Sequence, residues 1–554
     1  MSTPLSALRG AVDAAAVSVS PAGRAHGRPP TLERPPRVDF GDYSTNVALL
    51  LAPTLGEPPR QVAQRIGAAL AQGLGDTLER VEVAGPGFLN LFLSDAWFHS
   101  ALAHVLHAGA EHGGGGADPV TRIDIEFVSA NPTGPLTVAS GRHAAFGDAL
   151  ARILAFHGHH VHREYYVNDF GSQVRRLGES IRARARGDEL PPDGYAGDYV
   201  ADLVDPALAA EADVAELSGA GVKACLSWIE HTLKAFRVHF DEWFSEASLH
   251  VPAGPAGTDP VSRAIGVLEG KDVVYDSQGA RWLRTSDAGD DKDRVLERSS
   301  GERTYFASDI AHHQYRLARG YDLLIDVWGA DHHGYVRRMQ AAFAALGGAP
   351  QALEVVILQF VHLMTRGERA SMSKRRGEFV TLDDLMAEIG VDAARFFLIA
   401  RSADTTVDLD LDLARQSSAE NPVYYVQYAH ARIASMLARA GEERVTQALV
   451  GLTGAAPAAD GPPPALEAAE RTLIKKLAGF SVEVAEAAAR RAPHRIAAYA
   501  LELAQEFTAF YRDCRVLGAE PAAVESRRIG LSRATQHTIA RSLDLLGVHA
   551  PESM

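Results

Sequence analysis

One stretch of this chain, residues 126–141, limits the possible folds more than any other. It reads Glu-Phe-Val-Ser-Ala-Asn-Pro-Thr-Gly-Pro-Leu-Thr-Val-Ala-Ser-Gly. An apolar run leads into it, proline and glycine in its middle favour a turn, and a helical apolar pattern follows. The stretch therefore predicts a buried strand, a tight turn and the start of a helix. Such an arrangement can present backbone N–H groups to a phosphate.

Short runs rich in β-branched residues alternate with helical patterns from about residue 120 to 400. The runs begin at residues 123, 160, 323 and 353, and helical patterns cover 142–157 and 336–346. This alternation predicts an α/β fold with a doubly wound parallel sheet of the Rossmann type. Residues at about 180–300 interrupt the alternation with acidic, glycine-containing and helical material, so we expect an insertion there.

Two further domains are expected on either side of this sheet. Residues 1–105 predict a small α/β module, in which two strands are joined at Gly85-Pro86-Gly87. The glycine-rich segment 108–119 is typical of a linker. Residues 405–554 show helical periodicity and predict an all-α domain. Three domains fit a chain of 554 residues at roughly 100–200 residues per domain.

Composition excludes several classes of protein. The net charge of −15 argues against a generic polyanion binder, although a local basic face can still contact RNA phosphates. The two cysteines, Cys225 and Cys514, allow neither a disulfide framework nor a C-x-x-C zinc site. No apolar run reaches the roughly 18 residues that span a membrane, and no secretory apolar region is recognised. We therefore expect a cytoplasmic protein with no membrane partner.

A second motif, Ser371-Met-Ser-Lys-Arg375, falls on an expected loop before a helix that begins near Leu382. Lysine and arginine on a loop can neutralise the charge that develops when a carboxylate displaces pyrophosphate from a nucleotide. The same five residues also suit an ordinary surface loop. The strand, turn and helix upstream are what favour the phosphate-binding explanation.

A third motif, Trp328-Gly-Ala-Asp-His-His-Gly-Tyr335, follows an apolar strand and precedes a helix. This places it at the carboxyl edge of the sheet, where doubly wound folds bind ligands. The Asp331 carboxylate can hold ribose hydroxyls there. Two adjacent histidines suggest a metal instead, but no further ligand stands at a metal-site spacing. We predict no protein-bound metal.

Tyr305 and Asp309 are four residues apart, so on a helical turn they share one face. A carboxylate beside an aromatic ring suits a guanidinium group, which can form a bidentate pair and stack on the ring. The alternative explanation for this segment is an N-terminal helix cap.

Two segments are candidates for contact with RNA. Tyr424, Tyr428 and Arg432 fall on one side of a predicted helix and could stack unpaired bases, although core packing explains them as well. Phe88 and Asn90 lie on the second strand of the N-terminal module. A strand with one buried ring is an equally good local explanation for that pair.

These motifs together resemble those of class I aminoacyl-tRNA synthetases, and specifically of the arginyl-tRNA synthetases. Residues 126–141 are similar to the first class I signature. Residues 371–375 are similar to the second, Lys-Met-Ser-Lys-Ser/Arg, with Ser371 in place of the first lysine. The resemblance covers nearly the whole chain. It implies a monomeric ligase of protein biosynthesis that activates arginine with ATP and Mg²⁺ and transfers it to the 3′-terminal ribose of tRNA(Arg).

The resemblance also implies roles for individual residues. The arginine-binding set is Glu126, Asn131, Tyr305, Asp309 and His333. The ATP-binding set is Ala139, Gly329, Asp331, Met372, Ser373 and Lys374. The catalytic set is Lys374, Arg375, Thr137 and Ser140. The tRNA-binding set is Phe88 and Asn90 on the D-loop side, and Tyr424, Tyr428 and Arg432 in an anticodon-binding domain at 405–554.

The first signature departs from the family at its end, which normally reads His-x-Gly-His. Those positions are Thr137, Val138, Ala139 and Ser140 in this chain. In the family both histidines donate hydrogen bonds to the triphosphate, whereas Thr137 keeps only a shorter hydroxyl donor and Ser140 can still cap the helix. Removing one positioned donor commonly costs about 10²–10³ in rate, so two losses could cost roughly 10³–10⁵.

Three functions remain open on these residues. The first is a working arginine–tRNA ligase that compensates through Lys374, Arg375 and main-chain N–H groups. The second is a catalytically impaired paralogue that acts as a tRNA-binding, arginine-binding or regulatory module. The third is a slow, specialised supplier of arginyl-tRNA. ATP–pyrophosphate exchange in the presence of arginine and tRNA separates the ligase from the binding module.

Overall fold

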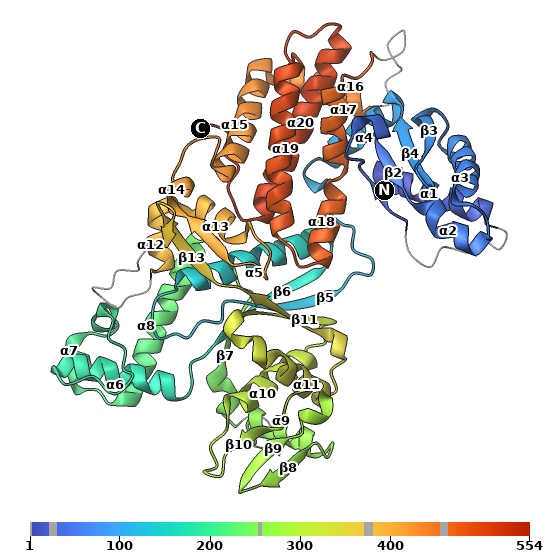
Figure 1. Ribbon diagram of the computed structural model, residues 1–554. Coiled ribbons are helices and arrows are strands. Elements are labelled where there is room, and N and C mark those ends of the chain that lie inside the picture. Colours follow the sequence, from blue (N-terminus) through green and yellow to red (C-terminus); the bar gives the residue numbers. More distant parts are fainter. Residues whose placement is uncertain (1–2, 21–29, 253–256, 370–379, 455–463) are drawn as a thin grey trace.

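The computed structural model describes residues 3–20, 30–252, 257–369, 380–454 and 464–554. Figure 1 shows a sheet at the centre of the molecule, a helical C-terminal bundle on one side of it and the N-terminal module beside that bundle. Two lobes extend from the opposite side of the sheet. One contains α6 (Ser172–Arg186) and α8 (Val214–Ala235), and the other contains a small antiparallel sheet.

The N-terminal module is a four-stranded sheet covered by helices. Its strands, in spatial order, are β1 (Leu32–Glu33), β2 (Tyr43–Thr45), β4 (Phe88–Leu93) and β3 (Leu78–Ala84). β3 and β4 pair as an antiparallel hairpin around Gly87, where an added Cβ would stand 2.9 Å from Pro59. The helices are α1 (Pro4–Val19), α2 (Val47–Leu55), α3 (Pro59–Leu74) and α4 (Asp95–Ala108).

The central sheet has five parallel strands in the order β12-β11-β5-β6-β7. They are β12 (Leu353–Leu358), β11 (Leu323–Gly329), β5 (Arg122–Glu126), β6 (His160–Val167) and β7 (Glu242–Ser245). The chain leaves β5 toward β6 on one side, while β11 adds to its other side. The carboxyl ends of β5 and β11 are therefore the topological switch point, where such folds bind ligands.

Helices cover both faces of this sheet. Ile325 belongs to the same apolar core as α5 (Val138–His157), whereas its neighbour Leu324 packs with α10 (Tyr305–Ala318) and α11 (Val336–Leu346). Adjacent strand residues point to opposite faces, so both faces are buried, as expected of a parallel sheet. The α/β, doubly wound fold predicted from the sequence is confirmed.

The segment at about 180–300 differs from the expected insertion in one respect, because β7 within it joins the central sheet as an edge strand. β7 has only four residues, too few to give a clear strand pattern. The rest of the segment forms the two lobes. The second lobe holds α9 (Pro260–Glu269), β8 (Val274–Ser277), β9 (Ala280–Leu283) and β10 (Arg294–Glu297).

The C-terminal region is helical, as predicted. Its helices are α15 (Pro422–Ala440), α16 (Glu442–Thr453), α17 (Ala468–Ala478), α18 (Phe480–Ala489), α19 (His494–Asp513) and α20 (Ala522–Leu545). Gly479 separates α17 from α18. The sequence shows clear helical periodicity only from residue 533, whereas α20 begins eleven residues earlier, at Ala522. Its periodicity is weak because Arg527 and Arg528 are buried too, paired with Glu470 inside the bundle.

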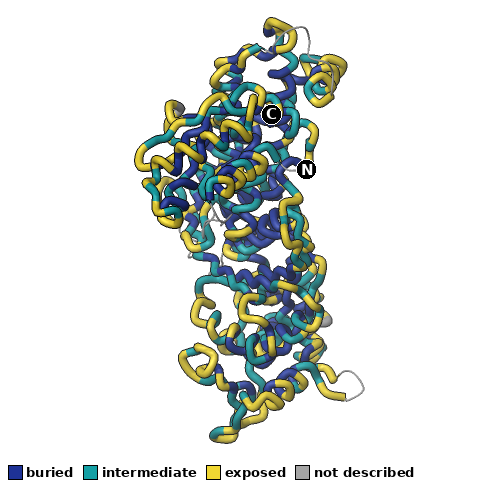
Figure 2. The backbone as a smooth tube through the Cα atoms, turned by 90° about the vertical axis from the view of Figure 1, so that its right-hand side faces the viewer, coloured by how far each residue is buried: buried dark blue, intermediate teal, exposed yellow. Residues whose placement is uncertain are grey.

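A small connecting region lies between the sheet and the bundle. It contains α12 (Leu382–Ile389), α13 (Val391–Ile399) and a sheet of β14 (Glu368–Arg369), β13 (Val361–Thr365) and β15 (Val407–Asp410). Buried backbone runs through the bundle and into the sheet in Figure 2. Within the described ranges, no helix combines the length and apolar character needed to cross a membrane.

Candidate active site

The turn after β5 has an unusual backbone. Val128 and Ser129 have φ values of 70° and 40°, and a β-branched residue rarely adopts such a conformation. Neighbouring groups hold it in place: the Asn168 side chain donates to the Ser129 carbonyl at 3.1 Å, and the Tyr166 N–H donates to the Ser129 hydroxyl at 3.1 Å. Backbone strain that is fixed in this way is common at functional sites.

A cleft of about 370 Å³ opens at the carboxyl ends of β5 and β11. Four of the five residues predicted to bind arginine line it: Glu126, Asn131, Tyr305 and Asp309. Gly329, predicted to contact ATP, lines it as well. The sequence prediction therefore assembles residues from β5, its turn, α10 and β11 around one cleft.

His333 does not line this cleft, whereas its neighbour His332 does. Residues Ala330–Tyr335 form a tight 3₁₀ turn, which points His333 toward a separate hollow with Asp290 and Arg294. The histidine of this turn that faces the cleft is therefore His332, not the predicted His333. Asp331 is exposed and lies 3.2 Å from the His332 ring.

The α10 wall of the cleft combines an open aromatic ring and a half-buried carboxyl group. Tyr305 is 53% exposed, so one face of its ring is open to a ligand. Asp309 accepts a hydrogen bond from the Tyr335 hydroxyl. Burial nevertheless raises the pKa of the Asp309 carboxyl, because the Tyr335 bond only partly offsets the loss of water.

A second carboxylate beside Asp309 was missed by the sequence prediction. Glu246 is 2% exposed, and within the described residues its Oε2 has no hydrogen-bond partner. Burial, followed by the nearby Asp309 charge, raises the pKa of Glu246 to about 8. The Tyr166 hydroxyl on the cleft wall is also buried without a partner in the described part of the chain. Glu246 directly follows β7. The sequence pattern did not reveal that strand, so it did not point to Glu246 either.

An arginine of the protein neutralises the carboxylates under the cleft. Arg316 is fully buried, and its guanidinium lies 2.6 Å from Asp124, 2.6 Å from Asp326 and 3.3 Å from Glu126. Arg316 and His313 lower the pKa of Asp326 despite its burial. Glu126 behaves differently, because burial and the Asp326 charge raise the pKa of its carboxyl.

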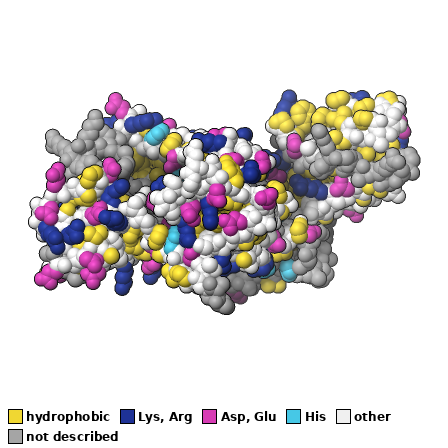
Figure 3. Space-filling model, turned by 90° about the horizontal axis from the view of Figure 1, so that it is seen from below, with side chains coloured by type: hydrophobic (Ala, Val, Ile, Leu, Met, Phe, Trp, Pro, Cys, Tyr) yellow, Lys and Arg dark blue, Asp and Glu magenta, His cyan; other side chains and the backbone are white. Residues whose placement is uncertain are grey.

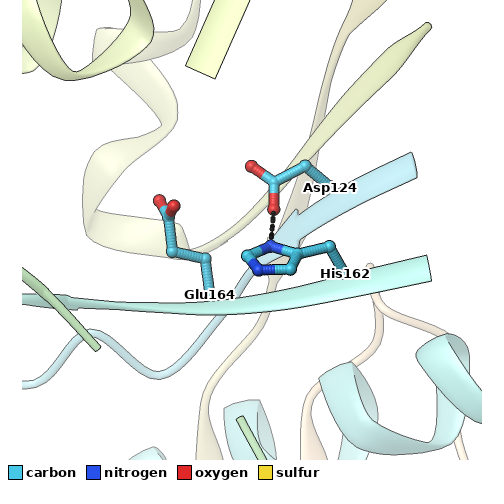
Figure 4. A group of neighbouring side chains, drawn as sticks. All are labelled: Asp124, His162 and Glu164. Atoms are coloured by element: carbon cyan, nitrogen blue, oxygen red, sulfur yellow. Dashed lines mark hydrogen bonds and ion pairs between the residues drawn. The ribbon is translucent and has the colours of Figure 1, made fainter. Parts of the chain in front are cut away.

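Two groups among the described residues have the spacing of metal ligands. They are Asp124, His162 and Glu164, shown in Figure 4, and Glu126, Glu164 and His312. The carboxylates of both groups already have protein partners, because His162 binds Asp124 at 2.9 Å and Arg316 pairs with Asp124, Glu126 and Glu164. A buried guanidinium already supplies positive charge here, so we assign no metal to these groups.

The altered signature at the start of α5 faces a second hollow. Thr137 is the N-cap residue and accepts the Ser140 N–H at 3.3 Å, so Thr137, rather than Ser140, caps the helix, because the helix begins at Val138. Thr137 and Ser140 line a hollow of about 490 Å³ that shares Asn131 with the cleft. Ala139 is exposed and lines neither space.

Two backbone hydrogen bonds join the signature turn to the residues that follow the Ser371–Arg375 motif. The Val138 N–H donates to the Val380 carbonyl at 3.3 Å, and the Leu382 N–H donates to the Leu136 carbonyl at 2.8 Å. Residues 370–379 lie outside the described residues, and with them the predicted Met372, Ser373, Lys374 and Arg375. The described end of that segment, at Val380, is therefore beside the signature turn.

The predicted tRNA-binding residues lie outside the cleft, on α15 of the bundle and on β4 of the N-terminal module. Tyr424 and Tyr428 stack with ring centres 6.3 Å apart, and the Arg432 guanidinium lies 4.6 Å from the Tyr511 ring. They line a cavity of about 650 Å³, and Tyr428 is 46% exposed, so core packing does not account for its ring.

In the N-terminal module, Phe88 is 39% exposed and Asn90 is buried. The Asn90 amide oxygen accepts a hydrogen bond from the Ser44 hydroxyl at 2.9 Å. The alternative of one buried ring at Phe88 is therefore wrong. An exposed ring at this position leaves a face that can stack on another group.

A Rossmann-type sheet with a ligand cleft at its switch point and a helical C-terminal domain fits a class I aminoacyl-tRNA synthetase, and comparison with known families assigns the chain to that class. Family models match three ranges: "Arginyl tRNA synthetase N terminal domain" at residues 6–93, "tRNA synthetases class I (R), catalytic domain" at 256–436, and "DALR anticodon binding domain" at 426–554. The chain belongs to the arginyl-tRNA synthetase family, which confirms the resemblance seen in its sequence.

Similar proteins cover nearly the full length. An "Arginine--tRNA ligase" of Nitratidesulfovibrio vulgaris (strain DP4) is 42% identical over 95% of both chains, and one of Bacillus subtilis (strain 168) is 43% identical over 94% of both. The solved structure of "Thermus thermophilus arginyl-tRNA synthetase" has a TM-score of 0.74 at 24% identity and covers 99% of each chain. That structure supports the shared fold.

Proposed function

We propose that this chain is an arginine–tRNA ligase. It would use ATP, as the Mg²⁺ complex, to form arginyl adenylate, and would then transfer arginine to the 3′-terminal ribose of tRNA(Arg). The observation that carries this proposal is the pair of carboxyl groups, half-buried Asp309 and buried Glu246, beside the open Tyr305 ring. Their raised pKa values show that the neighbouring groups do not offset their loss of water, which a bound guanidinium would do.

Arginine is proposed to lie with its guanidinium between Asp309 and Glu246 and against the Tyr305 ring. A planar guanidinium can form a forked hydrogen-bond pair with a carboxylate and stack on an aromatic ring at the same time. The α-ammonium group would then reach Glu126 and Asn131, at the end of β5 and in the turn. This leaves the arginine carboxylate directed toward β11 and the start of α5.

ATP is proposed to lie over Gly329 and the N-terminus of α5. A Cβ at Gly329 would stand 2.5 Å from the Asp331 carboxylate, so only glycine leaves this surface open. The α5 N–H groups favour phosphate at that end, and Lys374 and Arg375 would add positive charge. The arginine carboxylate attacks the α-phosphorus and pyrophosphate leaves. The terminal ribose 2′-OH then attacks the carbonyl carbon, and AMP leaves.

The tRNA is proposed to contact both outer domains. The cavity at Tyr424, Tyr428 and Arg432 suits unpaired anticodon bases, and the exposed Phe88 ring suits a D-loop base. On the face in Figure 3, basic side chains stand among acidic ones. Local basic residues can therefore contact RNA phosphates although the net charge of the chain is −15. We assign the domains as 1–105, 120–400 and 405–554, in a cytoplasmic monomer.

The ligase is favoured over an inactive binding module because similar full-length proteins are named arginine–tRNA ligases. The test is charging of tRNA(Arg) with labelled arginine by the intact protein and by Asp309→Asn. We expect charging by the intact protein and at least about a 30-fold lower kcat/KM for arginine in the variant, because leaving a buried charge unpaired costs about 2–5 kcal/mol. Equal charging by both proteins would contradict the assigned arginine site.

A further inference from the structure

His143, on the second turn of α5, faces the cleft. It is half-buried and lines the cleft next to Gly329, Trp328 and His332. Ala139 stands four residues earlier on the same helix, so the two side chains share one face. A nucleotide that lies over Gly329, with its phosphates toward the N-terminus of α5, therefore passes His143.

The surroundings of His143 fix its chemistry as a neutral imidazole. Burial, followed by the adjacent Arg142 cation, lowers the pKa of His143 to about 4, although the nearby Asp331 opposes this. The Val327 backbone beside the ring favours the charged form, but only weakly. A neutral imidazole keeps one nitrogen with a lone pair, so His143 can accept a hydrogen bond from a ligand.

The position of the ring relative to Gly329 identifies the ligand group. The His143 Nε2 lies 3.7 Å from the point where a Cβ on Gly329 would stand, and the Asp331 Oδ1 lies 2.5 Å from the same point. The space over Gly329 is therefore flanked by an imidazole and a carboxylate. Two neighbouring acceptors suit a group with two neighbouring O–H donors, which is the arrangement of the ribose 2′ and 3′ hydroxyls.

We propose that His143 is a nucleotide-binding residue of this chain, and that it accepts a hydrogen bond from a ribose hydroxyl of the ATP that lies over Gly329. This inference rests on the proposed ATP site. It adds an imidazole that the sequence motifs did not include, because residue 143 falls inside the apolar pattern of α5 and after the signature positions. His143 would fix the ribose, whereas Thr137 and Ser140 face the adjoining hollow.

The experiment compares ligands on the same protein. Equilibrium binding of ATP, 2′-deoxyATP and 3′-deoxyATP is measured for the intact chain, His143→Ala, His143→Gln and the control His157→Gln at the far end of α5. The intact chain is expected to bind ATP about 10–100-fold more tightly than the analogue that lacks the contacted hydroxyl. Because each ratio compares two ligands on one protein, partial loss of folded protein cancels.

His143→Ala is expected to lower this discrimination to about threefold or less, while His143→Gln, whose amide oxygen still accepts, keeps most of it. His157→Gln should match the intact chain. Discrimination that is unchanged in His143→Ala would overturn the proposal. Absence of ATP binding to the intact chain would instead contradict the proposed function, so the two failures are distinguishable.

Discussion

Arginine binding should depend steeply on pH because Glu246 must lose its proton to receive a guanidinium. The pKa of this buried carboxyl is raised to about 8 in the free protein, and a bound guanidinium would lower it. The charged, binding-competent form is therefore about half of the protein at pH 8 and most of it at about pH 9. Affinity for arginine should be highest there and should fall as the pH decreases.

The size of the effect follows from the pKa. At pH 7, one unit below the pKa, ionising Glu246 costs about 1.4 kcal/mol, which raises the Kd for arginine about tenfold. At pH 6 the same reasoning gives roughly 100-fold. Burial also raises the pKa of Asp309, which acts in the same direction. Titration calorimetry from pH 6 to 8, in buffers of different ionisation enthalpy, measures both the Kd and the released proton.

Glu246→Gln tests the assignment of this proton. The variant should bind arginine about 2–5 kcal/mol more weakly at pH 8 and should lose most of the pH dependence. The control is Glu302→Gln, because Glu302 lies on the surface and is 67% exposed. A Kd that does not change with pH in the intact protein, or an equal slope in Glu246→Gln, would refute the reasoning.

Three further predictions concern other parts of the molecule. Arg316→Met should lower the free energy of unfolding by about 3–5 kcal/mol, because it leaves buried carboxylates unpaired. Chemical denaturation measures this change, and the control Arg298→Met, at an exposed arginine, should alter the free energy little. Restoring histidine at 137 and 140 with glycine at 139 should raise the ATP–pyrophosphate exchange rate at least tenfold, and no increase would show that these positions do not limit it. Tyr428→Ala should raise the KM for tRNA about tenfold in charging assays without changing the KM for ATP; an unchanged KM for tRNA would remove Tyr428 from the RNA surface.

The parts of the fold that the sequence predicts are those with a strong repeating pattern. Runs such as those at 123 and 323 are long and rich in β-branched residues, and the parallel sheet follows from their alternation with helices. β7 has four residues and gave no such pattern. α20 was predicted too short because buried arginines interrupt its apolar periodicity.

The sequence predicts those residues of the candidate site whose spacing within a motif places them together. Tyr305 and Asp309 are neighbours on one helix, so their shared face follows from the sequence. The charge cluster under the cleft does not, because Glu126, Glu164 and Asp326 become neighbours only through the register of three parallel strands. Glu246 and His143 were missed for similar reasons: one follows an unrecognised strand, and the other stands inside a helical pattern.

The most direct measurement is ATP–pyrophosphate exchange by the intact protein with arginine and tRNA(Arg) present. An arginine–tRNA ligase should exchange label at a rate that depends on both, and Asp309→Asn should reduce it at least about 30-fold. Because this chain lacks both signature histidines, its exchange rate should be lower than that of the variant with histidine at positions 137 and 140 and glycine at 139. No exchange with arginine, together with tight binding of tRNA(Arg), would contradict the ligase and leave a tRNA-binding protein.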